Sequence, residues 1–254
     1  MRIAACIKRV PITGGRILLM DDGRAINTQH LAFTMSPHEE CGVEEAVRLI
    51  EANKGESVVV TLGPPEAVEQ LRDAMALGVD RAIHLQTDGQ EWDAEATAGA
   101  LLEAILTDEA TNGPFDIIFF GNESADSGGF QVGLRVAYAL GRPCVTGLKK
   151  VTLEGSSARC EQEVEGGRDV YVVPLPVVLT VKEGLNLPRY PSVPGRMRAR
   201  TKPVAMSTPP RPAPHLELVK LALPAGHGRR AESLGNGAEA APAVIDMLFL
   251  AGVL

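Results

Sequence analysis

The sequence has few aromatic residues, no excess of basic residues and no long uninterrupted apolar run. Phe, Trp and Tyr make up only 4% of the 254 residues, which removes the stacking surface that binders of single-stranded nucleic acid require. The formal net charge of −7 also disfavours a nucleic-acid partner. The longest apolar run, residues 170–181, is interrupted by Pro174 and Pro176 and is too short to cross a bilayer. We therefore expect no nucleic-acid partner and no direct membrane insertion.

The sequence also lacks paired cysteines and a recognisable catalytic or metal motif. Its four cysteines are far apart and form no Cys-x-x-Cys pair, which predicts reduced, mostly buried thiols. His38-Glu-Glu-Cys41 contains metal-ligating types, but adjacent helical residues point in different directions, so we predict no metal site there. No nucleophile, base and orienting group stand at a catalytic spacing, so we expect no catalytic residues. The chain begins directly with an apolar strand and no signal pattern, so we expect a cytoplasmic protein.

Residues 116–141 contain the clearest candidate for a ligand site. Asp116 opens a short apolar run that ends at Gly121, as a buried strand of a parallel sheet does. A loop of small residues follows, and helical spacing then begins at Phe130 and stops at Gly141. Phe130, Leu134, Ala137 and Tyr138 fall on one apolar face of this predicted helix.

This order of strand, glycine loop and helix start is the arrangement that binds phosphate. Unpaired backbone N–H groups and the positive end of the helix dipole both point at such a loop, and small residues let a ligand approach the backbone. The alternative is an ordinary turn between strand and helix, in which the glycines serve only the turn. The loop by itself leaves both interpretations open.

The first 140 residues alternate strands and helices. Strands are predicted at 2–7, 57–62, 81–85 and 116–120, and helices after Ser36-Pro37, after Pro65, after Asp93 and from Phe130. Ser36 and Asp93 are the expected N-caps. This alternation predicts an α/β fold with a parallel sheet and right-handed crossovers. The loops after Ile7, Leu62 and Phe120 should then converge at the carboxyl edge of that sheet.

The pattern changes after Gly141. Antiparallel strands are predicted at 145–153, 158–164 and 169–173, followed by a further apolar strand at 175–181. Residues 184–195 contain three prolines and predict a stiff surface loop, which leads into the basic stretch 196–202. We place one domain at 1–205, including a loop region at 184–200. Residues 206–254 are predicted to be an extended arm that cannot make its own core, and its terminal helix, 243–254, should dock either on its own domain or on another chain.

A series of short segments carries a family resemblance. They are Ile-Lys-Arg-Val (7–10), Pro37 followed by Val-Glu-Glu-Ala-Val-Arg-Leu (43–49), Val-Thr-Leu-Gly-Pro (60–64), Leu-Arg-Asp-Ala-Met-Ala-Leu-Gly-Val-Asp-Arg-Ala (71–82), Gly121 with Asp126 and Gln-Val-Gly (131–133), Glu-Val-Glu-Gly-Gly (163–167), Leu-Pro-Val-Val-Leu-Thr-Val (175–181) and Leu-Asn-Leu-Pro-Arg-Tyr-Pro-Ser-Val-Pro-Gly (185–195). In this order and spacing they resemble the beta subunits of electron transfer flavoproteins, over residues 1–206 and more weakly in the tail.

The resemblance implies an electron carrier rather than an enzyme. Such subunits have a Rossmann-like, adenine nucleotide alpha hydrolase-like domain and pair with an alpha subunit that holds most of the FAD. The beta chain itself usually buries an AMP, or a second FAD in electron-bifurcating members. The implied electron donor is a flavin dehydrogenase of the acyl-CoA dehydrogenase type, as in fatty acid beta-oxidation. The implied acceptor is an electron transfer flavoprotein–quinone oxidoreductase or a similar protein.

The resemblance also implies two groups of binding residues. Nucleotide contacts carry over to Cys6, Lys8, Ser36, Leu62, Gly63, Asp126, Gly129, Phe130, Gln131, Val132 and Gly133. Partner contacts carry over to Glu163, Leu185, Pro188, Arg189, Tyr190, Val193, Arg198 and Arg200. Within the second group, residues 184–195 match a loop that grips acyl-CoA dehydrogenases, with Val193 at an anchoring position. Glu163 matches a carboxylate that pairs with the flavin domain of the alpha chain.

Several residues depart from the family pattern and leave the nucleotide open. Ser36 replaces an Asn, the bulky Phe130 replaces a smaller side chain, and loop acid and threonine residues are missing. Thr13 and Val132 favour a second FAD, the missing loop residues disfavour it, and AMP is the simpler occupant. A stand-alone adenine-nucleotide binder or hydrolase on the same fold is the alternative function. Residues 184–254 distinguish the two functions, because a stand-alone nucleotide binder or hydrolase needs no stiff loop and docking tail.

Overall fold

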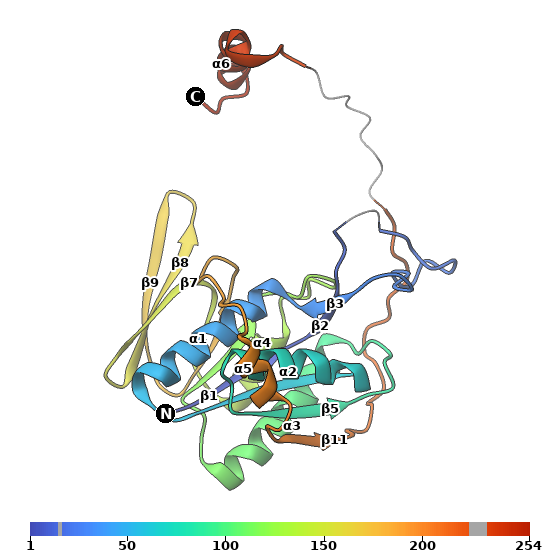
Figure 1. The fold of residues 1–254 in the computed structure, drawn as a ribbon, viewed down its shortest axis with the longest axis vertical. Coiled ribbons are helices and arrows are strands. Elements are labelled where there is room, and N and C mark those ends of the chain that lie inside the picture. The colour runs from blue at the N-terminus through green and yellow to red at the C-terminus, as the bar shows by residue number, and fades with distance from the viewer. Residues whose placement is uncertain (15–16, 224–232) are drawn as a thin grey trace. The chain divides into compact units, whose positions relative to one another are not determined.

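The computed structural model describes residues 1–14, 17–223 and 233–254, which form a mixed α/β protein (Figure 1). The chain divides into two compact units, Met1–Val219 and Lys220–Leu254. In the first unit, the elements are β1 (Arg2–Ile7), β2 (Arg9–Pro11), β3 (Phe33–Met35), α1 (Pro37–Asn53), β4 (Glu56–Gly63), the 3-10 helix η1 (Pro65–Ala67), α2 (Val68–Leu77), β5 (Arg81–Gln86), α3 (Ala94–Asn112), β6 (Ile117–Gly121), α4 (Val132–Leu140), β7 (Cys144–Glu154), β8 (Ser157–Val164), β9 (Gly167–Pro174), β10 (Val177–Val181), α5 (Val193–Ala199) and β11 (Val204–Ser207). The second unit contains η2 (Gly237–Ala240) and α6 (Ala241–Leu250).

The main sheet combines a parallel part with an antiparallel extension. Its strand order is β11-β5-β4-β1-β6-β10-β7-β8-β9, and β2 pairs separately with β3. Every neighbouring pair from β11 to β7 is parallel, whereas β7, β8 and β9 pair antiparallel. The α/β fold, its parallel sheet and its antiparallel extension are therefore confirmed.

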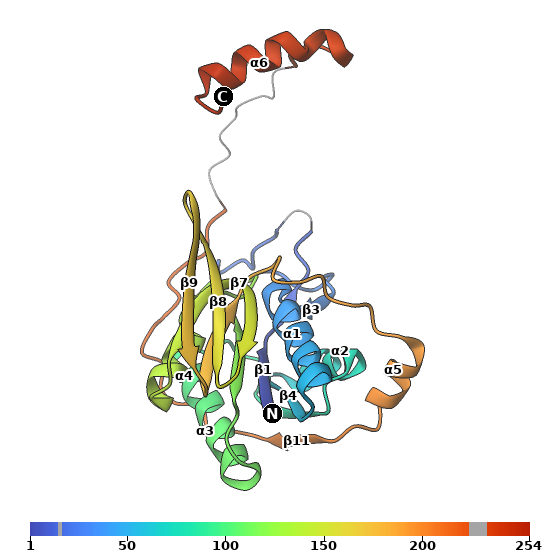
Figure 2. The ribbon, with the colours of Figure 1, turned by 90° about the vertical axis from the view of Figure 1, so that its left-hand side faces the viewer.

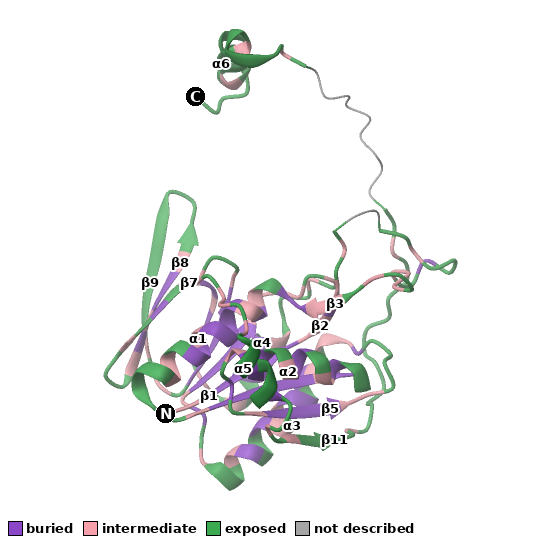
Figure 3. Cartoon of the chain, viewed as in Figure 1, coloured by how far each residue is buried: buried purple, intermediate pink, exposed green. Residues whose placement is uncertain are grey.

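Each face of the sheet is covered by its own pair of helices (Figure 2). Successive side chains of a strand point to opposite faces, so Ile3 and Ala5 pack with α1 and α2, whereas Ala4 and Cys6 pack with α3 and α4. The strands in the middle of the sheet are buried along most of their length, while β9 at one edge is mostly exposed (Figure 3). Apolar runs without alternation, such as 117–120, thus mark the strands covered on both faces.

Of the apolar face predicted for the helix after Gly129, only Ala137 is buried, and the prediction that the helix begins at Phe130 is wrong. Phe130, Leu134 and Tyr138 are exposed, and the buried residues of the helix are Gly133, Val136 and Ala137. The helix begins only at Val132, because Phe130 has a φ of +56° and is not helical. Gly133 determines the buried face, since a Cβ there would lie 2.9 Å from Thr180 Cγ2 and 3.1 Å from the side chain of Phe120.

Strand β11 was not predicted. Residues 204–207 pair in parallel with β5, with Val204 opposite Ala82 and Ser207 opposite Leu85. The strand crosses the domain boundary placed at 205, and the first compact unit continues to Val219. Arg211 extends this attachment through hydrogen bonds to the side chain of Gln90 and the carbonyl of Glu91. The part of the arm nearest the domain is thus joined to the sheet and to the loop that precedes α3.

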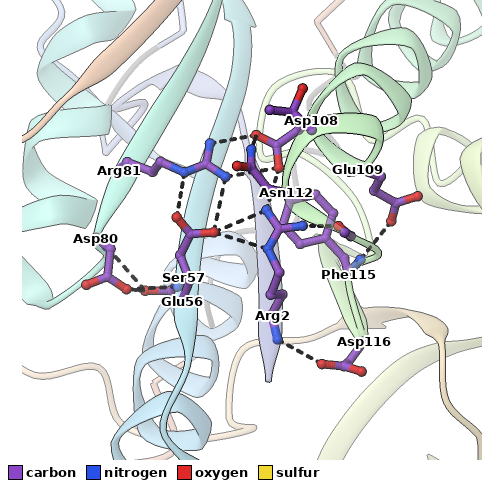
Figure 4. A network of polar contacts seen from close by, with 12 residues as sticks. Arg2, Glu56, Ser57, Asp80, Arg81, Asp108, Glu109, Asn112, Phe115 and Asp116 are labelled. Carbon is purple, nitrogen blue, oxygen red and sulfur yellow. Dashed lines mark hydrogen bonds and ion pairs between the residues drawn. The ribbon is translucent and has the colours of Figure 1, made fainter.

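An ion-pair network closes the amino edge of the sheet (Figure 4). Asp108 of α3 lies 2.5 Å from Arg2 Nη2 and 2.7 Å from Arg81 Nη1, and Glu56 pairs with the same two arginines at 3.1 and 2.7 Å. Burial would raise the pKa of Asp108, but the two guanidinium groups hold it below its usual value. The network ties β1, β4 and β5 to α3.

Candidate functional site

The carboxyl ends of β4, β1 and β6 lie side by side, as the strand order requires. Ile7 pairs with Thr61 across β1 and β4, and Cys6 pairs with Phe120 across β1 and β6. The loops after Ile7, Leu62 and Phe120 therefore start from one edge of the sheet. The long loop 122–131 follows β6, and Asn122 N donates to Val181 O at 2.9 Å, which fixes the start of the loop against β10.

Lys8, in the loop after β1, contacts the loops after β5 and β6 through its ammonium group. Its Nζ lies 2.9 Å from Asp126 Oδ2, 2.6 Å from Glu91 Oε1 and 3.2 Å from Ser127 Oγ. Burial alone would lower the pKa of Lys8, but the two carboxylates raise it above its ordinary value. Burial would raise the pKa of Asp126, but Lys8 and the surrounding hydrogen bonds lower it. The two groups therefore stay charged and bridge the ends of β1, β5 and β6.

Glu39 is a buried carboxyl group that contacts the backbone of Lys8. Its Oε2 accepts a hydrogen bond from Lys8 N, and its Cγ would lie only 2.8 Å from a Cβ at Gly121. Burial raises the pKa of Glu39 to about 8, against the smaller lowering effect of the Lys8 N–H and the Lys8 charge. At neutral pH this side chain is therefore mainly a neutral carboxylic acid, packed under the strand end that carries the loop.

Ser36 does not cap α1, contrary to the prediction. Its side chain makes no capping hydrogen bond, and its Oγ instead accepts from Ala125 N at 3.2 Å. Ser36 is buried, and the N-terminal turn of α1 is closed by hydrogen bonds from Glu39 N and Glu40 N to Ser36 O. The hydroxyl therefore holds the 122–131 loop against the start of α1. The predicted cap at Asp93 is confirmed, with Oδ1 accepting from Ala96 N at 2.7 Å.

The end of the loop and the start of α4 fit a phosphate group. Gly128 and Phe130 both have positive φ values, +55° and +56°, so the backbone turns sharply on either side of Gly129. A Cβ at Gly129 would meet no described atom within 4 Å, which leaves open space above this backbone. The Gln131 side chain does not cap the helix, so the first N–H groups of α4 remain available to an anion.

The remaining predicted nucleotide contacts surround this edge. Cys6 is buried in β1, and burial raises the pKa of its thiol, as expected for an unreactive cysteine. Gly63 ends β4, and its carbonyl accepts from Thr87 N at 2.9 Å and lies 3.2 Å from His84 Nε2. Lys8 contacts Asp126 directly and Ser36 contacts the same loop, but within residues 1–14, 17–223 and 233–254 no side-chain hydrogen bond or ion pair joins Cys6 or Leu62 to that cluster.

Sequence reasoning missed Glu39, Glu91 and His84. Glu39 was interpreted only as an acidic residue in a helix first turn, and nothing in its spacing shows that it is buried against Gly121. Glu91 approaches Lys8 across 83 residues of sequence. Such contacts depend on the strand order, which single-sequence patterns do not give.

Some of the predicted partner residues pack against the protein itself, and the others are exposed to solvent. Leu185 packs against the core, and the Arg189 guanidinium contacts Glu44 and Glu51 of α1. Tyr190 and Val193 are 96% and 73% exposed, as is the unpredicted Leu187 at 85%. Arg198 and Arg200 are exposed, and Glu163 is exposed near Lys149 at 3.9 Å. Pro188 is half-buried.

Among the described residues, two classes of site are not found. No group of three or more His, Cys, Asp or Glu side chains in residues 1–14, 17–223 and 233–254 is placed to hold a metal ion. Within the same ranges, no helix is long and apolar enough to cross a membrane.

Comparison with known proteins identifies the family. A family model described as "Electron transfer flavoprotein domain" matches residues 24–211. The chain is 36% identical over 199 residues to the electron transfer flavoprotein subunit beta of Bacillus subtilis, covering 78% of this chain and 72% of that protein. The chain belongs to the electron transfer flavoprotein beta subunit family. It is also 36% identical to the Syntrophomonas wolfei subunit (88% and 86% covered) and 35% identical to the mitochondrial subunit of Arabidopsis thaliana (82% and 82% covered).

The residues matched by the family model include both candidate binding regions, the loop before α4 and the loop after β10. The electron transfer flavoprotein model covers α1 to β11, and so includes both the loop 122–131 and the exposed loop after β10. β1 and Lys8, which follows it, precede the matched residues, but the pairing of β1 with β4 and β6 places the end of β1 at the same sheet edge.

Proposed function

We propose that this chain is the beta subunit of a heterodimeric electron transfer flavoprotein. With an alpha subunit that holds most of the FAD, it carries electrons from flavin dehydrogenases of the acyl-CoA dehydrogenase type to a quinone oxidoreductase or similar acceptor. The observation that carries the proposal is the exposed loop 184–195. It presents Leu187, Tyr190 and Val193 to solvent and continues into the exposed Arg196, Arg198 and Arg200. Aromatic and apolar anchors beside arginines are the usual composition of a protein-docking surface.

We also propose that the sheet edge holds an adenine nucleotide, with AMP as the first assignment and a second FAD as the alternative. The N–H groups at the start of α4 and the open backbone at Gly129 would receive the phosphate. Lys8, Asp126 and Ser36 would hold the surrounding loops in place. A bound flavin supplies the electron chemistry, and the chain's own residues bind, orient and exclude water.

The terminal arm supports a heterodimer. Helix α6 exposes Val244, Ile245, Met247, Phe249 and Leu250 within its own unit. A helix that is apolar on most of its surface requires a partner to cover it. We propose that the arm docks on the alpha subunit. A chain that is well behaved as a monomer would instead support the stand-alone nucleotide binder.

Substitution of Val193 by Asp tests the docking loop. We expect the kcat/KM for reduction of the heterodimer by an acyl-CoA dehydrogenase to fall about tenfold, because a charge replaces an exposed apolar anchor. Flavin content should be unchanged, since Val193 lies on α5, away from the loop 122–131. Leu106→Asp, at an exposed apolar position on α3, is the matched control. Loss of flavin with Val193→Asp, or equal rates for both variants, would count against the assignment.

A further inference from the structure

The exposed loop after β10 is attached to α1 by Arg189. The guanidinium lies 2.9 Å from Glu44 Oε2 and 2.7 Å from Glu51 Oε1, and the backbone N–H of Arg189 donates to Glu44 Oε2 at 3.2 Å. The Glu44 side chain is only 1% exposed, so its charge depends on arginine for compensation. The hydrogen bond from Arg189 lowers the pKa of Glu51, which keeps this second carboxylate charged.

A second attachment precedes Arg189 in the loop. Asn186 Nδ2 donates to Cys41 O at 3.0 Å and to Glu45 Oε2 at 2.9 Å. Residues 186 and 189 thus face α1, while the residues next to each of them, Leu187 and Tyr190, face solvent. The inward contacts therefore determine which side chains the loop presents outward.

The other end of the loop is fixed to α2. A Cβ at Gly195 would lie 2.5 Å from Ala76 O, so α5 approaches α2 more closely than any other residue would allow. Arg72 donates to the carbonyls of Ala199 and Lys202 at 2.5 and 2.7 Å. The loop is therefore held at both ends, and Tyr190 and Val193 project between the two attachments. Such a surface loses little conformational entropy when a partner binds.

We infer that Glu44 and Arg189 are positioning residues for partner recognition. Arg189 lies in the docking loop, but its guanidinium is committed to two carboxylates of its own chain, so it acts by fixing Tyr190 and Val193 rather than by contacting the partner. The inference rests on the proposed docking function and adds a buried residue of α1 to the determinants of that function. No partner can reach Glu44 while the loop covers it.

The test compares Glu44→Gln, Arg189→Ala and Arg189→Lys in the purified heterodimer. The probe is an acyl-CoA dehydrogenase supplied with excess acyl-CoA, and the KM for the heterodimer is measured separately from kcat. We expect Glu44→Gln and Arg189→Ala each to raise KM about tenfold and to leave kcat and flavin content unchanged, because the loop loses its preorganised conformation. Arg189→Lys should not restore KM, since an ammonium group cannot bridge two carboxylates as a guanidinium does.

Arg48→Ala is the matched control. Arg48 Nε lies 2.8 Å from Glu44 Oε1, so this variant also removes an arginine from Glu44, but it does not touch the loop. Its KM should stay near that of the unsubstituted protein. Val193→Asp in the Arg189→Ala background should add little to the rise in KM, because the positioning that Val193 needs is already lost.

Two results would overturn the inference. If Arg189→Ala raises KM and Glu44→Gln does not, Arg189 contacts the partner directly. If neither raises KM and only the melting temperature falls, the pair is merely structural. Where Glu44→Gln does not fold, Glu51→Gln removes the second carboxylate from an exposed position and should raise KM in the same direction.

A different result would contradict the proposed function itself. It is contradicted if the unsubstituted heterodimer accepts no electrons from the dehydrogenase. Amide hydrogen exchange of residues 184–192 then still decides whether Glu44 and Arg189 fix the loop: faster exchange in both variants supports the attachment, and unchanged exchange overturns it.

Discussion

Substitution of Asp108 by Asn should destabilise the protein by about 3 kcal/mol, since breaking a buried ion pair leaves uncompensated charge behind. The Asp108 side chain is 7% exposed and compensates two arginines that are themselves largely buried. Glu56, which is more exposed, would remain as the carboxylate paired with both guanidinium groups in the network of Figure 4. Urea unfolding of the full-length protein at pH 7 measures the change.

The pH dependence of this effect has a definite sign. Because the folded pKa of Asp108 is lowered, its stabilising contribution is present above the unfolded value near 4 and is lost as the pH falls through the folded pKa. The difference between Asp108→Asn and the unsubstituted protein should therefore shrink below about pH 4. Glu103→Gln, at an exposed position of the same helix, is the control. Equal stability of both variants at pH 7 would show that the network contributes nothing.

Substitution of Glu39 by Gln should stabilise the protein at alkaline pH. Burial raises the folded pKa of Glu39 from 4.5 to about 8, so the unsubstituted protein loses stability as the pH rises from the first value to the second. Gln is neutral throughout and keeps an acceptor for Lys8 N. With about 1.4 kcal/mol per pKa unit, we expect a gain on the order of 4–5 kcal/mol at pH 8.5 and little change near pH 4.5.

The measurement is urea unfolding of both proteins between pH 4.5 and 8.5. Glu66→Gln, at an exposed position on the 3-10 helix after β4, controls for the loss of one formal charge. A Glu39→Gln variant that is less stable than the unsubstituted protein at pH 8.5 would mean that the native carboxylate is ionised and its charge is needed by Lys8 or the loop. That result would contradict the neutral carboxyl group described here.

The sequence predicted those features of the fold that depend on neighbouring residues. The strands predicted at 57–62 and 116–120 became central parallel strands, and those predicted at 145–153, 158–164 and 169–173 became antiparallel hairpins. The convergence of the loops after Ile7 and Phe120 followed from parallel topology alone. These signals are local periodicity and turn chemistry, and they need no knowledge of distant contacts.

The features that sequence reasoning missed depend on contacts between distant segments. The inward face of α4 is determined by the approach of Gly133 to Thr180, and the role of Ser36 by a loop 89 residues away. Arg189 stands in a Pro-rich surface loop, and only its contact with Glu44, 145 residues earlier, shows that it faces inward. β11 was missed because its four residues next to a Pro-rich segment become a strand only by pairing with β5.

The proposed role as the beta subunit of a heterodimer can be tested by co-expressing this chain with a candidate alpha subunit. The complex is then purified, and the nucleotides that it releases are quantified. We expect a stable heterodimer with one FAD and one AMP per pair. Two FAD and no AMP would keep the family function but assign the second flavin to the edge formed by Lys8, Asp126 and the start of α4. A chain that forms no stable complex and brings no flavin with it would contradict the electron-carrier function.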